Sequence, residues 1–411
     1  MKLCISQSGT LLTAAILVLG IGCRADSRPS SDAPRVDSTS SIILEEALSA
    51  LHRADFSAAM GLVEGVEERQ PGLVEAQYVK GQIYYDLRLY DEAEAHWRNV
   101  LESEPDYWLW WQNLGDVVFH KEEFRKSADY YRRAAELDEN PLAWHGLAGA
   151  YWELGQPDSA ADALHRAVEA DSLFAPVYLS LSNLAEERGD LEEAYALARR
   201  AVRLDPGSQD ARLAAGVLGI RLGRFEEATG YLEPVLESEP WNVTALYNLG
   251  LAKQRAGRAD EARELLDAAE EARSMQAVID VRQDAIRSNP RNPANYMALA
   301  EVLHDAGRLD DALRAYKTVD LMVPPDPHLR HTIATLQLEM GEYMDAIIRY
   351  HDVMRRDSTF VEAWVNLGIA YARMNQVEQA RGIWKEASRR FPNDATVAEM
   401  LTRLQPSVPA E

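Results

Sequence analysis

The chain has 411 residues, and its 66 acidic against 43 basic side chains give a net charge of −23. This charge would repel the phosphates of nucleic acids and the anionic surface of a membrane, so we expect no nucleic-acid partner. Richness in Ala, Leu, Glu and Arg favours helices over sheets. The two cysteines, Cys4 and Cys23, both lie near the start, which excludes a disulfide framework or a thiolate metal site in the rest of the chain.

A signal peptide is predicted at residues 1–22. Met1 and Lys2 give a positive start, and the apolar run at 11–21 is short for a membrane span but typical of an export signal. The run ends in Leu-Gly-Ile-Gly-Cys, which resembles a bacterial lipobox. That resemblance implies that Cys23 is lipidated and attached to a membrane leaflet facing the periplasm, with the outer membrane favoured.

The alternative is ordinary secretory cleavage, for instance after Ala25, which would leave a soluble periplasmic or secreted protein. In either case residues 23–41 are rich in Ser, Pro and Asp and show no apolar periodicity. Such a segment cannot bury enough surface to offset the entropy of ordering it. We therefore predict a disordered tether over 23–41, with Cys23 at its start.

A small residue followed four positions later by an aromatic or aliphatic residue recurs through the chain. It stands at Ala59, Ala93, Ser127, Ala160, Ala194, Ala228, Ala262, Ala312, Ala346 and Ala380. Successive members are 34 residues apart, except for one step of 33 and one of 50. A nearly constant period of this length indicates a repeat architecture.

The last copy carries a fuller pattern. It contains Trp364, Leu367, Gly368, Tyr371, Ala380, Trp384, Ala387 and Pro392. This set resembles the tetratricopeptide signature, which implies two antiparallel helices per repeat. We therefore predict an all-α fold, an α-solenoid of tetratricopeptide helical hairpins with about nine repeats, one half-repeat and a C-terminal capping helix.

Two recurring residue types support these hairpins. Small residues such as Gly81 and Gly115 mark the place where the two helices of a repeat touch, and a larger side chain there should separate them. Gly155, Gly189 and later glycines at the same interval fall between the two helices. A residue that tolerates positive φ is needed there to end the first helix.

The 50-residue step divides the array. It predicts an N-terminal block of repeats over 42–273 and a C-terminal block over 291–394. Residues 274–290 are predicted to form an inserted half-repeat helix, which either acts as a joint between the blocks or continues the preceding helix. Residues 395–411 are predicted to be a capping helix and a tail, because an end repeat exposes an apolar face.

In the tetratricopeptide family the first helix of each repeat lines a concave face, so the resemblance implies a protein or extended peptide as partner. The predicted contact set on these helices is Tyr78, Gln82, Tyr85, Gln112, Asn113, Asp116, Phe119, His120, His145, Trp152, Asn183, Asn248 and Asn366. Its early members are unusually aromatic, and such rings can anchor an apolar side chain while fixing a hydrogen bond.

Two features qualify this contact set. The three close tryptophans Trp108, Trp110 and Trp111 indicate the alternative that some rings pack between neighbouring helices. Three of its asparagines, at 113, 248 and 366, occupy the position at which family members pair with the backbone of a peptide, but they are not in adjacent repeats.

Sequence motifs of catalysis are absent. The chain has no HExxH pair, no GxSxG elbow and no phosphate-binding glycine loop, and His328 with His331 lacks a carboxylate at metal spacing. We expect no enzyme activity, no cofactor and no metal. The sequence favours a non-catalytic protein-interaction scaffold or assembly factor of the bacterial cell envelope, touching the membrane only through an N-terminal lipid. The alternative is a soluble periplasmic or secreted accessory protein that binds a small ligand or glycan in the aromatic groove.

Overall fold

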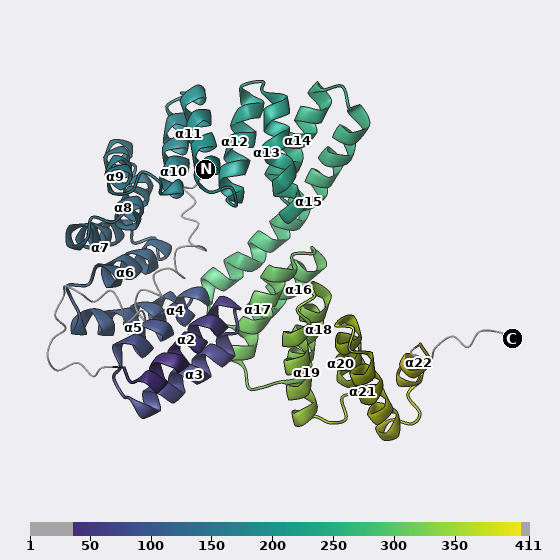
Figure 1. The fold of residues 1–411 in the computed structure, drawn as a ribbon. Coiled ribbons are helices and arrows are strands. Elements are labelled where there is room, and N and C mark those ends of the chain that lie inside the picture. Colours follow the sequence, from purple (N-terminus) through teal and green to yellow (C-terminus); the bar gives the residue numbers. More distant parts are fainter. Residues whose placement is uncertain (1–35, 404–411) are drawn as a thin grey trace. The chain divides into compact units, whose positions relative to one another are not determined.

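The computed structural model describes residues 36–403, so the predicted signal peptide, Cys23 and most of the predicted tether lie outside the described residues. From α2 to α22, every regular element in this range is a helix (Figure 1). Each helix packs mainly against its neighbours in the sequence, and the pairs form successive hairpins. The predicted all-α solenoid of helical hairpins is confirmed.

The helices group into two units, which meet in the sequence at Ala277 and Val278. The first unit contains α2 (Ser38–His52), α3 (Phe56–Arg69), α4 (Val74–Asp86), α5 (Tyr90–Ser103), α6 (Trp108–His120), α7 (Phe124–Leu137), α8 (Pro141–Glu153), α9 (Pro157–Ala170), α10 (Ala175–Glu187), α11 (Leu191–Leu204), α12 (Gln209–Arg221), α13 (Phe225–Ser238) and α14 (Val243–Arg255). Even-numbered helices here are the first helices of their hairpins.

The second unit continues the same alternation. It contains α16 (Pro293–Asp305), α17 (Leu309–Met322), α18 (Pro327–Met340), α19 (Tyr343–Arg356), α20 (Val361–Arg373), α21 (Val377–Arg390) and α22 (Ala395–Arg403). The short α22 closes the series: its Val397 is buried and packs with Trp364, Val365 and Ala387.

One long helix, α15 (Ala259–Ser288), passes through the division between the units. Residues 274–288 therefore continue the second helix of the preceding repeat, which is one of the two alternatives that the sequence leaves open. Ile279 and Ile286 are buried, whereas Val278 and Val281 remain exposed. The half-repeat has no first helix of its own.

Side-chain caps explain where several first helices begin. The Asp37 carboxylate accepts from the Ser40 N–H at 2.7 Å, and Asn140 and Asn242 cap α8 and α14 in the same way. The cap at Asp37 corrects the predicted tether boundary, because α2 starts at Ser38 and not after residue 41. A Ser-rich composition is typical of a disordered segment, but an Asp followed by small polar residues also favours a helix start.

The turn between the two helices of each hairpin needs one left-handed residue. Gly155 (φ 69°) and five later glycines at the repeat interval have positive φ, as predicted. Three other hairpins place Arg88, Glu122 and Asn375 at this same position, with φ between 60° and 62°. The fold thus imposes the conformation even where the side chain opposes it.

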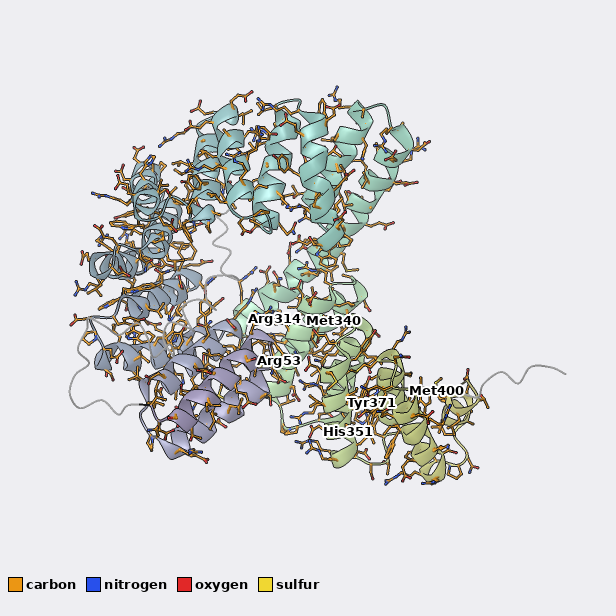
Figure 2. All side chains as sticks on the ribbon, in the orientation of Figure 1. Arg53, Arg314, Met340, His351, Tyr371 and Met400 are labelled. Carbon is orange, nitrogen blue, oxygen red and sulfur yellow. The ribbon has the colours of Figure 1, made fainter. Side chains whose placement is uncertain are left out.

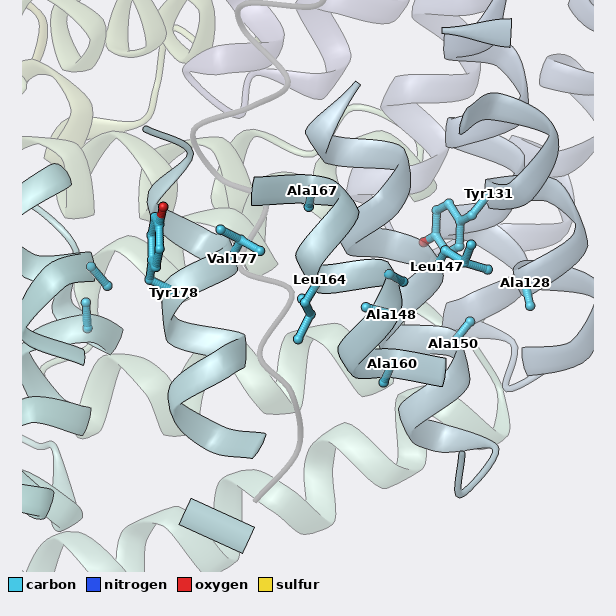
Figure 3. Packing of buried hydrophobic residues seen from close by; sticks show 13 residues of the cluster. Ala128, Tyr131, Leu147, Ala148, Ala150, Ala160, Leu164, Ala167, Val177 and Tyr178 are labelled. Carbon is cyan, nitrogen blue, oxygen red and sulfur yellow. The ribbon is translucent and has the colours of Figure 1, made fainter. Parts of the chain in front are cut away.

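The small residues of the first helices touch large rings of the second helices. A Cβ on Gly81 would lie 2.2 Å from the Trp97 indole, and one on Gly368 would lie 2.1 Å from the Trp384 indole. The Trp97 Nε1 also donates to the Tyr78 carbonyl at 3.1 Å. Figure 3 shows the corresponding layer around Tyr131, Leu147 and Ala148, where small and large side chains interlock.

The two units differ in charge. Residues 36–277 carry 23 basic and 45 acidic side chains, a net charge of −22, whereas residues 278–403 carry 16 basic and 18 acidic ones, a net charge of −2. Nearly all of the net negative charge of the chain therefore lies in the first unit.

In the second unit His351 of α19 and Tyr371 of α20 lie side by side, with 3.4 Å between Nε2 and the hydroxyl (Figure 2).

Candidate functional site

All members of the predicted contact set lie on first helices. Three are on α4, five on α6 and two on α8, which are consecutive first helices of the first unit. Asn183 and Asn248 lie further along this unit, on α10 and α14, and Asn366 lies on α20 of the second unit. We call the surface formed by the side chains of first helices the first-helix face, and its part on α4, α6 and α8 is the candidate site.

Tyr78 belongs to the core. Its ring is 1% exposed and lies 5.2 Å from the Trp110 ring and 6.5 Å from the Trp97 ring. For Tyr78 the structure therefore shows the packing alternative. Trp111 is also bound internally, because its Nε1 donates to the Pro105 carbonyl at 2.8 Å. The close tryptophans thus serve different layers of the fold.

A second ring cluster joins α4 to α6 near the ends of these helices. The Tyr85 hydroxyl lies 2.9 Å from His120 Nε2, and the His120 ring stacks on Tyr90 at 5.2 Å and 3°. Phe119 meets the edge of His120 at 6.2 Å. Tyr85 and Phe119 are half-buried and His120 is exposed. This ring cluster is the more open aromatic part of the candidate site.

Polar side chains lie beside these rings. Gln82 donates to Asp86 at 3.1 Å and Gln112 donates to Asp116 at 3.2 Å, each within one helix. Asp116 also accepts from the Tyr131 hydroxyl at 2.6 Å. Burial, followed by the charge of Asp116, raises the pKa of Tyr85, so the neighbourhood is desolvated and negative.

His145 and Trp152 on α8 have different settings. His145 is buried, and its Nε2 lies 2.8 Å from the Ser180 hydroxyl on α10. Burial lowers the pKa of His145 to about 4, so the ring is neutral at pH 7. Trp152 is half-buried and packs on the core cluster of α7 to α12. His145 therefore ties two first helices together, whereas part of Trp152 stays open.

The predicted asparagines do not share one environment. Asn113 is 1% exposed, inside the fold. The Asn248 amide donates to the Thr244 carbonyl of its own helix at 2.8 Å, and the Asn366 amide lies 3.3 Å from both His331 Nε2 and Thr335 Oγ1. Asn183 is half-buried on α10. Within the first unit, Asn113, Asn183 and Asn248 lie on three different first helices, none of them adjacent.

The predicted contact set lacks three contributors on second helices and one, Asp86, at the end of the first helix α4. Trp97 and Tyr131 carry the rings beneath the site, Tyr90 stacks on His120, and Asp86 pairs with Gln82. A signal was available for Trp97 and Tyr131, because both stand four residues after the recurring small residue. Nothing in the repeat pattern singles out Tyr90 or Asp86.

Neither a metal-binding cluster nor a membrane-spanning helix occurs among residues 36–403. No group of three or more His, Cys, Asp or Glu side chains in this range is arranged to hold a metal ion. Within the same range, no helix has both the length and the apolar character required to cross a bilayer. His328 and His331 instead contact the Phe360 ring, at 4.9 Å and 4.8 Å between centroids.

Comparison with protein families gives repeated matches along the chain. One model described as tetratricopeptide repeat matches residues 44–96, 78–141, 145–209 and 281–327. A second model with the same description matches residues 185–237, 220–279 and 337–404. The matches follow the hairpins of the structure through both units.

Several curated proteins resemble parts of the chain. Superkiller complex protein 3 of Mus musculus is 23% identical over 376 residues, which are 89% of this chain and 21% of that protein. Superkiller protein 3 of Schizosaccharomyces pombe is 29% identical over 106 residues, which are 26% of this chain and 8% of that protein. The beta-barrel assembly-enhancing protease of Escherichia coli K12 is 31% identical over 133 residues, which are 30% of this chain and 27% of that protein. The chain thus spans about a quarter or less of the length of these relatives.

Two solved structures align with parts of the chain. PilW, a type IV pilus biogenesis factor, is 20% identical and aligns over 51% of this chain and 98% of its own, with a TM-score of 0.45. YrrB, described as a TPR protein with an unusual peptide-binding site, is 22% identical and aligns over 43% of this chain and 91% of its own, with a TM-score of 0.36.

Proposed function

Because the chain belongs to the tetratricopeptide repeat family, we propose that it is a non-catalytic scaffold that binds a protein or extended peptide on the first-helix face of its first unit. The observation that carries this proposal is the joint cluster of rings and acceptors on α4 and α6. Rings with a polar edge, such as Tyr85 and His120, are typical anchors at protein interfaces. Repeat matches from residue 44 to 404 support binding rather than catalysis.

The proposal places this scaffold in a bacterial cell envelope, exported and held to a membrane, by preference the outer one, through a lipid on Cys23. Its support is the apolar run at 11–21 and the Gly22-Cys23 pair. Mass spectrometry of the mature chain should find an acylated Cys23 as the first residue. An unmodified chain that begins beyond Cys23 would instead favour the soluble periplasmic or secreted alternative.

An assembly factor is one form that the scaffold could take. The partial match to the beta-barrel assembly-enhancing protease supports this form by its name alone. Only 27% of the protease is matched, so its proteolytic activity is not part of the proposal. The small-ligand or glycan alternative would use the same aromatic groove, without Tyr78, whose ring packs in the core.

Site-specific photocrosslinking tests the scaffold proposal. A benzoylphenylalanine in place of Trp152 or Tyr85, on the first-helix face, should give a discrete adduct with another protein, identified by mass spectrometry of the linked peptides. The matched control is Arg166, which is exposed on the second helix α9. Equal adducts from both faces, or no protein adduct from position 152 or 85, would contradict the proposal.

A further inference from the structure

A Gln and an Asp four residues apart occur on two consecutive first helices. On α4 the Gln82 amide donates to Asp86, and on α6 the Gln112 amide donates to Asp116. A carboxylate can only accept hydrogen bonds, so each amide must turn its NH₂ group toward the acid. The carbonyl oxygen of each Gln then points away from that bond and, together with the carboxylate, offers acceptors to a ligand.

These carbonyl oxygens lack donors. Gln82 is 4% and Gln112 is 7% exposed, and within the described residues neither Oε1 atom has a hydrogen-bond partner. A buried acceptor left without a donor loses its bond to water and gains none in return, so such atoms call for an explanation. A ligand that brings N–H groups would supply the missing donors.

The charges of the first helices favour a cationic ligand. The helices α6, α8 and α10 contain neither Lys nor Arg, and Lys80, the basic residue of α4, is bonded to Glu67 of α3. Lys121 and Lys126, which follow α6 in the sequence, bind Glu94 of the second helix α5. The acidic groups of α4 and α6 therefore have no Lys or Arg beside them on α6, α8 or α10, and Arg88, in the turn after α4, is the basic residue whose charge acts on Tyr85 and His120.

We propose, on the basis of the scaffold function above, that the Gln82–Asp86 and Gln112–Asp116 pairs form a receptor for a cationic side chain of the partner, arginine in preference to lysine. A guanidinium has five N–H donors in a planar fork and no acceptor, which complements two amide carbonyls and two carboxylates. Its flat face can stack on a ring such as Tyr85.

A peptide titration tests this receptor. Fluorescence anisotropy of labelled alternating Arg-Ser, Lys-Ser and citrulline-Ser decapeptides should rank their affinities for the full chain in that order, because citrulline keeps the shape of Arg without its charge. The double variant Asp86→Asn/Asp116→Asn should weaken Arg-Ser binding about thirtyfold, since it removes both charges that face the ligand. The amide oxygen that Asp116→Asn introduces can still accept from the Tyr131 hydroxyl.

The matched control is Asp138→Asn/Glu139→Gln, which removes the same net charge at the exposed turn before α8 and should change binding by about twofold or less. Equal losses in both variants, or equal binding of the citrulline peptide, would overturn the receptor. Should the double variant unfold in a thermal melt, Asp86→Asn alone decides, because Asp86 is only half-buried. It should lose more affinity than the control does.

The two proposals can fail separately. A protein adduct from position 152 without Arg-Ser binding would remove the receptor and leave the scaffold. Arg-Ser binding with the expected losses, but no protein adduct, would leave the receptor and remove the scaffold.

Discussion

One histidine position occurs in both units with different surroundings. His145 of α8 is buried, and its Nε2 lies 2.8 Å from Ser180 Oγ on the next first helix. His331 of α18 is only half-buried, and its Nε2 lies 3.3 Å from Asn366 Nδ2 on the next first helix. In both cases the partner is 35 residues further along the chain.

The comparison extends to the neighbouring ring. His145 lies 5.8 Å from Phe174, and His331 lies 4.8 Å from Phe360, which stands at the same repeat position. The repeat thus builds one polar link between consecutive first helices twice. Burial and charge separate the two versions: the first is sealed in a unit of net charge −22, and the second is open in a unit of net charge −2. The assignment of binding to the first unit rests on a separate observation, the cluster of rings and acceptors on α4 and α6.

The largest effects should come from a contact that occurs inside the hairpins of both units, between a glycine of the first helix and a ring of the second helix. Gly115→Ala in the first unit and Gly368→Ala in the second should each lower the free energy of unfolding by about 3 kcal/mol, because the new Cβ would lie 2.6 Å from the Tyr131 ring or 2.1 Å from the Trp384 indole. Urea unfolding measures both. The helical glycines Gly230 and Gly382 have open surroundings and provide controls, which Ala should stabilise by about 0.5–1 kcal/mol. If Ala at the control glycines lowers the free energy of unfolding as much as Ala at 115 and 368, the close contact between glycine and ring is not the cause of the loss.

The next effect concerns the pH dependence of the free energy of unfolding, to which His145 and His331 should contribute differently. Burial lowers the pKa of His145 to about 4. The unfolded chain therefore binds a proton near pH 6.5 that the folded chain refuses, and stability is lost as pH falls below that value. At pH 5 the loss should be about 2 kcal/mol relative to pH 7. His145→Gln should remove this part of the pH dependence, and an unchanged dependence would show that the folded ring has the same pKa as the ring in the unfolded chain.

A smaller loss is expected at His331. Burial also lowers the pKa of this ring, but it is only half-buried, and the charge of Glu362 acts in the opposite direction. The same comparison of wild type with His331→Gln, between pH 7 and pH 5, should therefore give a smaller change than His145→Gln does. A larger change at 331 would reverse our distinction between a sealed and an open link.

The smallest effect concerns a hairpin turn of the first unit. Glu122 has φ 62° at the position where Gly155 has φ 69°. Glu122→Gly should raise the free energy of unfolding by about 1 kcal/mol, because it relieves the left-handed strain of a residue with a Cβ. Thermal unfolding should show this gain, while Gly155→Ala should show a loss of similar size. Destabilisation by Glu122→Gly would mean that the side chain contributes more than the strain.

The fold was largely predictable because its signals repeat. The spacing of small residues located the hairpins, and glycines such as Gly155 located the turns. Glu122 shows the limit of that reasoning, because the turn forms there without the glycine that marks the same position in other repeats. The start of α2 was missed because Asp37 and the serines after it suit a disordered segment and a helix cap equally well.

The candidate site was less predictable. Helical periodicity placed Tyr78 and Tyr85 on the correct helix, but it could not say what covers each ring. Tyr78 is covered by Trp110 of the next repeat, whereas Tyr85 keeps part of its surface open. The Gln–Asp pairs could be found in the sequence as an i, i+4 pattern. The missing donors of their carbonyl oxygens could be seen only in the structure.

The central claim is that the first-helix face of the first unit holds a protein partner. Hydrogen–deuterium exchange of the full chain, with and without the protein captured at position 152, tests it most directly. We predict new protection in α4, α6 and α8 and no change in the first helices α18 and α20 of the second unit. Protection confined to second helices, or centred on α18 and α20, would contradict this account.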